Sequence, residues 1–515
     1  MFSNTQAYQK SKSIDLAFVI KAGFISFFIF LPGLFQFYFY GRLIYALVSV
    51  SLMLALYSFM ILFHINLYIF IPLMFMAIFN IFITVILKRM VGAFDYISII
   101  NTNHREIFAF FANKAFSIAL LVLISSLIIV ALGKLFTINF KNSHTIIIKK
   151  KFFVLLLLLS LIPLFFINKK DILSSYPFAC LLDTIVNWNF SKKASKYSNF
   201  KYSFEGEIVD PKKELNFILV IGESARRSSF GFSSFYASET TTSLTSRMDE
   251  ISILYPEKCV IMNNYISTGH STVPTILTML NPLGSDAILD CFDKPNLLVL
   301  LRSAGFHLSL LKSQLCGYVD EYLSVTDETL YFLDKSDLDM LQTIEKKIHS
   351  EGKRFIIIHT KGSHFSSLNI QGGSYPDSIR ITDQFLSSLF NMIQRCEKAT
   401  CVWFVSDHGE NLTYLHGSGN ITTDEIEVPS IIFANLTFIK FTEKRWKNLK
   451  FNAGTLTSHY NLAHTIMGML HVFPQNYYHS QKDLSSINYV ENTNPVLIPN
   501  NMIPISYKSC MSKKD

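Results

Sequence analysis

Polar side chains that can bind metals follow three apolar runs of this sequence. They are Glu223 after "NFILVIG", Ser363 and His364 after "RFIIIHT", and Asp407 and His408 after "CVWFV". The runs are short and rich in β-branched residues, which predicts buried strands. The carboxyl ends of parallel strands meet at one edge of a sheet, where ligands bind. Carboxylates and imidazoles without a thiolate pattern suit Zn2+ or Mn2+, so we predict a metal site at this edge.

The segment "SDHGENLTYLHG" (406–417) contains the densest group of these residues. Asp407 and His408 are adjacent, and they could bind one ion because the backbone turns after a strand. His416 is expected to reach a second ion or the substrate. We interpret Glu410 as a supporting or helix-capping group rather than a ligand.

A candidate nucleophile lies in "NNYISTGHSTVPTILTML" (263–280), where hydroxyls precede an apolar helical run. These hydroxyls are Ser267, Thr268, Ser271 and Thr272. A hydroxyl at a helix N-terminus gains from the helix dipole and from free backbone amides. Beside a divalent cation its pKa falls, and it can then attack phosphorus. A simple helix N-cap is the alternative, since Ser and Thr are favoured caps.

The elements that position these residues belong to an α/β domain predicted at about 215–515. "VPSIIFAN" (428–435) reads as a further buried strand, and "NLLVLLRSAGF" (296–306) reads as a helix closed by Gly305. Strands that alternate with helices predict a sheet covered by helices on both faces.

The first third of the chain is much more apolar than this domain. It contains five stretches near the ~20 residues that a bilayer-spanning helix requires. They lie at about 17–38, 42–63, 66–87, 114–135 and 152–168. We predict a transmembrane domain of five helices at 1–170, with an outer loop at about 88–113. A polar, basic linker at 171–214 connects it to the α/β domain.

Lysines indicate how the predicted helices cross the membrane. Lys10 and Lys12 precede the first stretch, and Lys149, Lys150 and Lys151 precede the fifth. Five crossings place both clusters on the cytoplasmic side under the positive-inside rule, and the α/β domain on the outer side. Lys88 and Arg89 fall on the outer side and count against this orientation.

Charge and cysteine content exclude some classes of protein. The net charge is +8, but no basic and aromatic motif indicates a nucleic-acid partner. None of the seven cysteines forms a C-x-x-C pair, which disfavours a zinc ribbon or a thioredoxin-like site. All seven follow the last apolar stretch, as disulfides in an oxidising compartment would. Cys396 with Cys401, and Cys291 with Cys316, are candidate pairs among several, and the odd count leaves at least one cysteine unpaired in a monomer.

With these residues in place, the chain resembles the membrane-bound phosphoethanolamine transferases of the alkaline phosphatase and sulfatase superfamily. The resemblance covers nearly the whole chain, including the five stretches. Its motifs, in chain order, are "NTNHREIF", "VIGESARRSSFGF", "ETTTSL", "HTKGSHFSS", "DSIRITDQFL", "SDHGENLTYLHG", "VPSIIFAN" and "SHYNLAHTIMGML". Several ordered motifs together are specific, although each alone is not.

The resemblance implies a role for each matching position. Glu223, Asp407, His408 and Thr272 would bind the catalytic zinc, and Thr272 would be the nucleophile that becomes phosphorylated. Ser271 and Thr268 remain alternative nucleophiles. His364 and His416 would bind a second zinc or the phosphoryl group, so one or two Zn2+ ions are expected, in preference to Mn2+.

The resemblance also implies a substrate pair and a place in the cell. Phosphoethanolamine would pass from phosphatidylethanolamine to lipopolysaccharide, at a core sugar or at lipid A, through a phosphothreonine. The segment "STGHST" stands where members that modify lipid A have "SCGTAT", which favours the core-sugar type. The enzyme would be a multi-pass protein of the bacterial inner membrane, with its catalytic domain in the periplasm. The alternatives are a phosphoglycerol transferase, a membrane-tethered phosphatase or sulfatase, and a scaffold with a degenerate enzyme domain.

Overall fold

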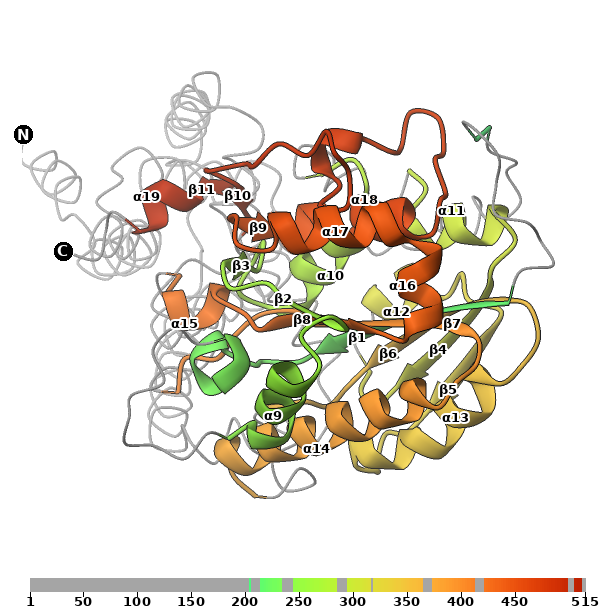
Figure 1. Cartoon of the computed structure of the whole chain (residues 1–515). Helices are drawn as coiled ribbons and strands as arrows, with labels where there is room; N and C mark the ends of the chain where they lie inside the picture. Colours follow the sequence, from blue (N-terminus) through green and yellow to red (C-terminus); the bar gives the residue numbers. More distant parts are fainter. Residues whose placement is uncertain are drawn as a thin grey trace, which may run out of the picture. The chain divides into compact units, whose positions relative to one another are not determined.

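The computed structural model describes most of the chain from residue 203 onward (Figure 1). The described ranges are 203–204, 214–233, 244–284, 294–315, 318–364, 373–412, 421–498 and 504–511. The five predicted membrane spans, the loop at 88–113 and the boundary at 170 lie outside them. Among the described residues, no helix is both long enough and apolar enough to cross a membrane.

A sheet of seven strands forms the centre of the α/β domain, in the order β2-β8-β7-β1-β6-β4-β5. Its strands are β1 (Leu215–Gly222), β2 (Cys259–Ile261), β4 (His307–Lys312), β5 (Glu328–Tyr331), β6 (Lys353–His359), β7 (Ala399–Ser406) and β8 (Ser430–Ala434). The strands from β7 to β5 run parallel, whereas β8 is antiparallel to both β7 and β2. The short strands β3 (Tyr265–Ile266), β9 (Thr457–Ser458), β10 (Val496–Leu497) and β11 (Ile505–Ser506) form two small separate sheets. All four strands that the sequence predicted are present.

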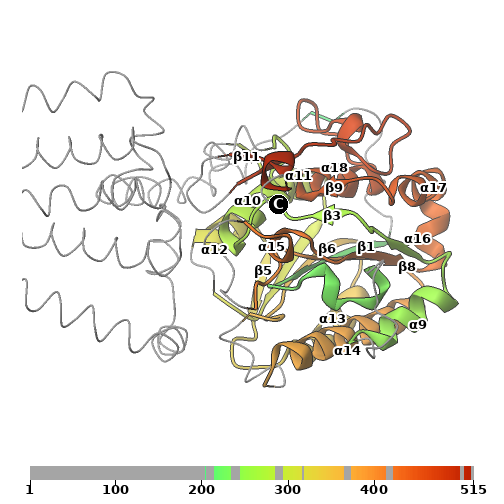
Figure 2. The same cartoon turned by 90° about the vertical axis from the view of Figure 1, so that its left-hand side faces the viewer.

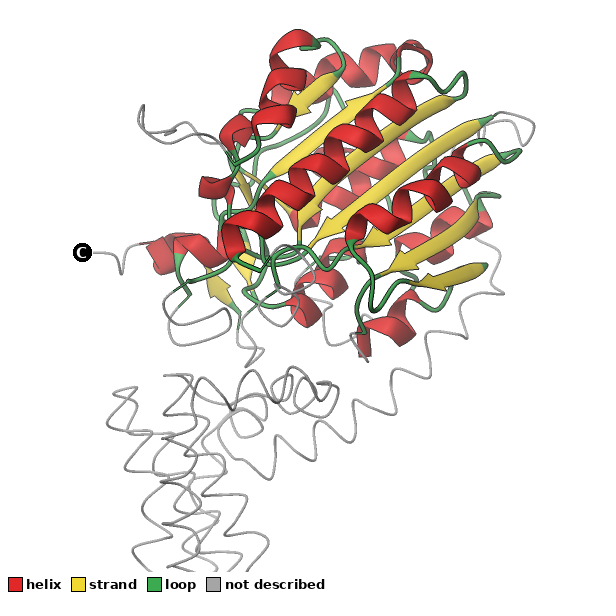
Figure 3. Ribbon diagram, turned by 90° about the horizontal axis from the view of Figure 1, so that it is seen from below, coloured by secondary structure: helices red, strands yellow, loops and turns green. Residues whose placement is uncertain are grey.

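Helices cover both faces of the large sheet, as the sequence predicted (Figures 1 and 2). One face carries α9 (Ser246–Leu254), α13 (Leu341–Ile348) and α14 (Tyr375–Gln394), and Figure 3 views the sheet from this side. The other face carries α10 (Thr272–Leu280), α11 (Leu297–Ser303), α12 (Tyr318–Leu323), α16 (Leu436–Phe441), α17 (Glu443–Asn452) and α18 (His459–Met469). The short helices α15 (Thr423–Ile426) and α19 (Tyr507–Met511) lie outside these two layers.

The central strands are buried on both faces, which explains their unbroken apolar runs. Successive side chains of a strand point to opposite faces. Phe217 and Leu219 of β1 therefore join the core beneath α10 and α18, while Ile218 and Val220 join the core beneath α14.

Helix ends follow local sequence signals. The side chain of Asn296 caps α11 by accepting a hydrogen bond from the amide of Val299 at 3.1 Å. Gly305 takes a left-handed φ of 83° two residues beyond the helix, which confirms the predicted end. The side chain of Ser374 likewise caps α14, the helix that contains the motif "DSIRITDQFL".

The predicted disulfide between Cys396 and Cys401 is wrong. Both residues are buried free cysteines. Cys401 lies in β7 and joins the core on one face of the sheet, whereas Cys396 joins the core on the opposite face. Cys396 lies in the turn between α14 and β7, so the sheet itself separates two thiols that are close in sequence. Cys291 and Cys316, the other predicted pair, lie outside the described residues.

Alkylation tests the state of these thiols. When the full-length protein is unfolded in denaturant without reductant, we expect iodoacetamide to label both Cys396 and Cys401, as read by peptide mass spectrometry. In the folded protein Cys401 should stay unlabelled, because burial raises the pKa of its thiol well above the usual value. A peptide pair linked through Cys396 and Cys401 would contradict the structure.

Candidate metal centre and nucleophile

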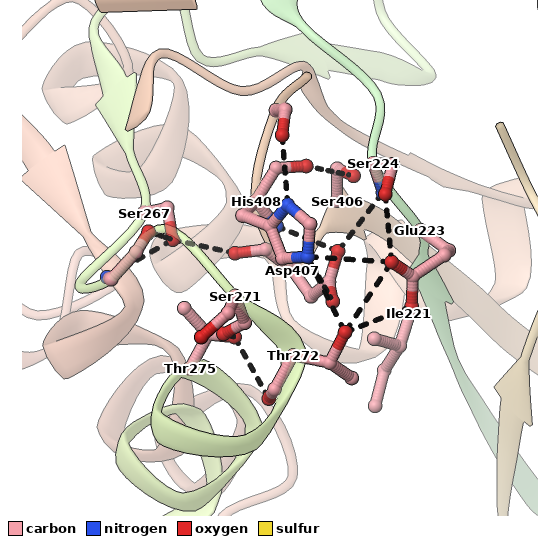
Figure 4. A network of polar contacts seen from close by, with 12 residues as sticks. Ile221, Glu223, Ser224, Ser267, Ser271, Thr272, Thr275, Ser406, Asp407 and His408 are labelled. Atoms are coloured by element: carbon pink, nitrogen blue, oxygen red, sulfur yellow. Dashed lines mark hydrogen bonds and ion pairs between the residues drawn. The ribbon is translucent and has the colours of Figure 1, made fainter. Parts of the chain in front are cut away.

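Two carboxylates and an imidazole from two adjacent strands meet at the carboxyl edge of the sheet (Figure 4). Glu223 directly follows β1, and Asp407 and His408 directly follow β7. One possible ligand atom from each of the three lies within 4.8 Å of the other two, and all three residues are fully buried. The parallel register opposes Gly222 to Ser406, so the residues that follow both strands leave the sheet at the same level.

Glu223 is held in place by the next residue of its own chain segment and by the loop after β6. Ser224 adopts a left-handed φ of 57°, and its Oγ donates a hydrogen bond to Glu223 Oε1 at 2.8 Å. The Ser224 amide donates to Asp407 Oδ1 at 3.2 Å. Gly362 packs so closely on Glu223 that a Cβ atom at this glycine would lie 2.6 Å from the Glu223 carbonyl oxygen. The amide of Ser363 donates to that same oxygen at 2.8 Å.

Thr272 faces this cluster from the first residue of α10. Its Oγ1 lies 3.3 and 3.2 Å from the two Glu223 carboxylate oxygens and 3.3 Å from His408 Nε2. The structure therefore brings together all four residues expected to bind the catalytic metal. Ser271 is the N-cap residue, and its carbonyl accepts a hydrogen bond from Thr275. The Thr268 hydroxyl is hydrogen-bonded to that of Thr278, two helical turns along α10.

The loop that precedes Thr272 is tied directly to the loop that carries Asp407. Ser267 Oγ donates to the Asp407 carbonyl oxygen at 2.5 Å, and the Ser267 amide donates to the Ile426 carbonyl at 2.7 Å. His459, which is buried in α18, lies with Nε2 3.1 Å from the Ser406 carbonyl and Nδ1 3.4 Å from the Thr268 amide nitrogen. Hydrogen bonds at both loops thus set the distance between Thr272 and the strand ends.

Burial and mutual charge shift the proton affinities in the cluster. Burial disfavours the Glu223 charge, but hydrogen bonds from His359 and His408 hold its pKa well below the usual value. Burial and the neighbouring Glu223 charge raise the pKa of Asp407 to about 6. Although burial disfavours the charged imidazole, Asp407 and Glu223 raise the pKa of His408 to about 10. Without a metal, His408 thus carries a proton between two carboxylates.

The donor set fits a divalent cation. Two carboxylates buried side by side repel each other unless a positive charge lies between them. Asp407 Oδ2 accepts no hydrogen bond from the described residues, although it is buried. Two carboxylate oxygens, one imidazole nitrogen and a hydroxyl oxygen make up the four-ligand set with N and O donors that Zn2+ accepts. Glu223, Asp407, His408 and Thr272 would hold such an ion.

Two residues of this site were not predicted from the sequence. His359 ends β6, and its Nε2 lies 3.7 Å from Glu223 Oε2. Gln314 lies two residues after β4, and its Nε2 donates to Glu223 Oε2 at 2.6 Å and lies 2.9 Å from His359 Nε2. A histidine that closes a buried apolar run was the available signal for His359. Nothing in the sequence pattern distinguishes Gln314.

The other expected residues have different outcomes. His364 lies in the loop after β6, and its role as a ligand of a second zinc or of the phosphoryl group stays a prediction. His416 lies outside the described residues. Glu410 is buried, and its supporting role stays a prediction. His270, two residues before Thr272, faces the buried carboxylate of Glu425.

Comparisons with known proteins agree with this fold. The family model described as Sulfatase matches residues 215–472. The chain is 25% identical over 273 residues to phosphoethanolamine transferase OpgE of Escherichia coli K12. This match covers 46% of this chain and 48% of that protein. The match therefore spans about half the length of this curated relative.

Two solved structures share the fold. The integral membrane protein lipooligosaccharide phosphoethanolamine transferase A (EptA) from Neisseria meningitidis superimposes with a TM-score of 0.60 at 17% identity, over 89% of this chain and 95% of that chain. The C-terminal periplasmic domain of EcEptC from Escherichia coli, in complex with Zn, superimposes with a TM-score of 0.52 at 15% identity, over 60% of this chain and 96% of that chain. At these identities the likeness establishes the fold.

The proton on His408 gives the metal-free protein a characteristic pH dependence. A histidine whose pKa is raised on folding adds stability that is complete below its unfolded pKa and is lost as pH rises through the folded value. We therefore expect the melting temperature of metal-free full-length protein to fall between about pH 6.5 and about pH 10, the raised pKa of His408. The His408→Gln variant should show a smaller fall over the same interval, measured by differential scanning calorimetry in detergent. Equal falls in both proteins would contradict the assigned protonation.

Proposed function

The chain belongs to the sulfatase family, and we propose on that basis that it transfers phosphoethanolamine from phosphatidylethanolamine to lipopolysaccharide. The observation that carries the proposal is the Thr272 hydroxyl, placed 3.2 to 3.3 Å from Glu223 and His408 at the N-terminus of α10. A hydroxyl that faces a set of metal ligands is a nucleophile arrangement for phosphoryl transfer. The relatives named as phosphoethanolamine transferases support the choice of headgroup.

Two successive displacements account for the transfer. Thr272 Oγ1 attacks the phosphorus of phosphatidylethanolamine, and the bond from phosphorus to the diacylglycerol oxygen breaks. The Thr272 hydroxyl gives up its proton as it attacks, and the departing diacylglycerol oxygen takes one up. An acceptor hydroxyl or phosphate then attacks the phosphothreonine, and the bond from phosphorus to the Thr272 oxygen breaks. The proton that an acceptor hydroxyl loses restores the Thr272 hydroxyl, which completes the transfer.

The described residues supply orientation and charge for these steps. The amides of Thr272 and Val273 at the start of α10 would face the negative oxygens of the phosphoryl group, whereas Pro274 has no N–H. Gln314 and Ser224 donate hydrogen bonds to Glu223 and hold its carboxylate toward Thr272. A bound Zn2+ would lower the pKa of the Thr272 hydroxyl and neutralise charge on the transferring group. A zinc complex of a protein with this fold supports zinc over manganese. His364 and His416 would hold the phosphoryl group or a second zinc.

The same proposal explains the apolar first third of the chain. The donor is a membrane lipid, so a catalytic domain tethered to the bilayer meets it at a high effective concentration. We place the catalytic domain in the periplasm and the anchor in the inner membrane. The name of the Neisseria neighbour, a lipooligosaccharide transferase, supports a lipid-linked sugar as the acceptor.

Trapping the covalent intermediate tests the nucleophile. After incubation of the full-length protein with phosphatidylethanolamine in detergent, we expect peptide mass spectrometry to find phosphoethanolamine on Thr272. The Thr272→Ala variant should carry none, because its methyl group has no oxygen to form the phosphoester. Ser271→Ala is the matched control and should keep the adduct. An adduct that persists in Thr272→Ala, on Ser271 or elsewhere, would contradict the assignment.

Lipopolysaccharide from cells that express the protein tests the acceptor. We expect a mass increase of one phosphoethanolamine on a core sugar, absent from cells that express Thr272→Ala at the same level. Fragmentation of the glycolipid by tandem mass spectrometry locates the group on core sugar or on lipid A. Unmodified lipopolysaccharide together with released free phosphoethanolamine would indicate a hydrolase, and a phosphoglycerol product would indicate the other transferase class.

A further inference from the structure

The segment around α15 binds three separate loops of the site through consecutive backbone carbonyls. The Glu425 carbonyl accepts from the Gly409 amide at 2.7 Å, in the loop that carries Asp407 and His408. The next carbonyl, of Ile426, accepts from Ser267 at 2.7 Å, in the loop that leads to Thr272. The Glu427 carbonyl accepts from Arg227 at 2.8 Å, in the segment that follows Glu223. Three residues of one short segment thus connect the three chain segments that carry Glu223, Thr272 and the pair Asp407 and His408.

The fit between this segment and the metal loop is tight. A Cβ atom at Gly409 would lie 1.9 Å from the Asp424 carbonyl oxygen, so only glycine allows the loop to approach α15. The side chains add ion pairs to the backbone bonds. The guanidinium of Arg226 lies 3.6 Å from Asp424 Oδ2, and that of Arg227 lies 2.6 Å from Glu427 Oε2.

One side-chain pair in this region is fully buried and contacts the nucleophile loop. His270 Nδ1 lies 3.5 Å from Glu425 Oε1, and neither side chain is exposed to solvent. Glu425 Oε2 accepts from the Thr422 amide and hydroxyl, both at 2.8 Å. Burial disfavours the charge on Glu425, but His270 and Thr422 hold the pKa of Glu425 below its usual value. The carboxylate is therefore charged at neutral pH.

A buried carboxylate beside an imidazole is a weak source of stability, because both groups lose their hydration and apolar residues of similar volume often replace such pairs without loss. What the pair provides is placement, because Thr422 fixes the carboxylate and His270 Nδ1 packs 3.5 Å from Glu425 Oε1. His270 is two residues before Thr272, so its placement sets where α10 begins.

We propose that His270 and Glu425 are a positioning pair that sets the Thr272 hydroxyl at its distance from Glu223 and His408. This inference rests on the proposed function, since it assigns the pair to the same nucleophile and metal site. Ser267 fixes one end of the loop to the strand ends, and the His270–Glu425 pair fixes the other end, next to the helix. Without the pair, Ser267 still holds one end of the loop, but no contact at the other end fixes the distance of the Thr272 hydroxyl from Glu223 and His408.

Cobalt spectroscopy of the full-length protein tests the pair independently of activity. Co2+ that replaces zinc gives visible absorption bands that report the ligand set and geometry, and Thr272→Ala supplies the reference spectrum without the Thr272 oxygen. We expect His270→Gln and Glu425→Gln to shift the bands toward that reference. The double variant should shift them no further than either single variant, because the two side chains act as one unit.

Kinetics provide the second readout. A displacement of about 1 Å at a reacting atom can cost about 100-fold in rate. We therefore expect kcat to fall by about that factor in His270→Gln and in Glu425→Gln, with the KM for phosphatidylethanolamine within about twofold of wild type. The kcat of the double variant should equal that of either single variant, because the two factors are not expected to multiply.

Two matched controls separate positioning from loss of a buried polar group. His464 is also fully buried. Its Nε2 is hydrogen-bonded to the Pro282 carbonyl, and its Nδ1 accepts from the His479 amide. Asp383 is a buried carboxylate that accepts from two amides of α9, on the other face of the sheet. His464→Gln and Asp383→Asn should lower the melting temperature and leave the cobalt bands and kcat unchanged.

The outcomes distinguish this inference from the proposed function. Wild-type bands and kcat in both His270→Gln and Glu425→Gln would overturn the positioning pair and leave the proposed function standing. Multiplied effects in the double variant would also overturn it, because the residues would then act separately. A wild-type protein that shows no cobalt bands would contradict the metal site itself, and the positioning role would fail with it.

Discussion

The parallel register of β1 between β6 and β7 is the constraint on which the site depends. It opposes Ile221 to His359 on one side and Gly222 to Ser406 on the other, so three strands end at one level. A slip of one residue would turn the side chains of a strand to the opposite faces of the sheet. Gly222 makes the level possible, because a Cβ atom there would lie 2.8 Å from the Phe404 ring and would separate the strands. Because both faces are buried, the strand register is fixed, and this register also fixes where Glu223, Asp407 and His408 leave the sheet.

Because these strand ends meet, two carboxylates that repel each other are buried side by side. Glu223 and Asp407 are fully buried neighbours, and the structure balances them with a protonated His408, bonds from Gln314 and the amide of Ser224. Metal binding must displace the His408 proton, so binding and protonation are linked. In the proposed enzyme the cation would replace a mobile proton with a fixed charge, facing the hydroxyl of Thr272. Strain at Ser224 and the close approach of Gly362 are consistent with a site that the surrounding fold holds in place.

Much of this arrangement could be predicted from the sequence, for physical reasons. Buried strands leave continuous apolar runs, and Glu223, Asp407 and His408 stand directly after them. Thr272 was selected from several hydroxyls only through a family resemblance, whereas the structure separates it from Thr268 by distance. The Cys396–Cys401 disulfide failed because spacing in sequence does not show which face of a sheet a strand residue takes.

Other parts of the site could not be predicted. Gln314 reaches Glu223 only because β4 pairs with β6, and a pairing between distant strands leaves no local pattern. His359 was counted as the end of a strand, and its imidazole has a role only beside Glu223. Residues 422–427, around α15, are mostly polar and carry no motif, and their bonds to three loops exist only in the folded chain.

Anomalous diffraction at the zinc edge, from crystals of the full-length protein grown with Zn2+, tests the central claim most directly. The account predicts a peak surrounded by Glu223, Asp407, His408 and Thr272, with metal–oxygen and metal–nitrogen distances of about 2.0–2.2 Å. A second peak near His364 would agree with a two-zinc site. Zinc bound elsewhere, with Thr272 Oγ1 outside its coordination sphere, would contradict the account.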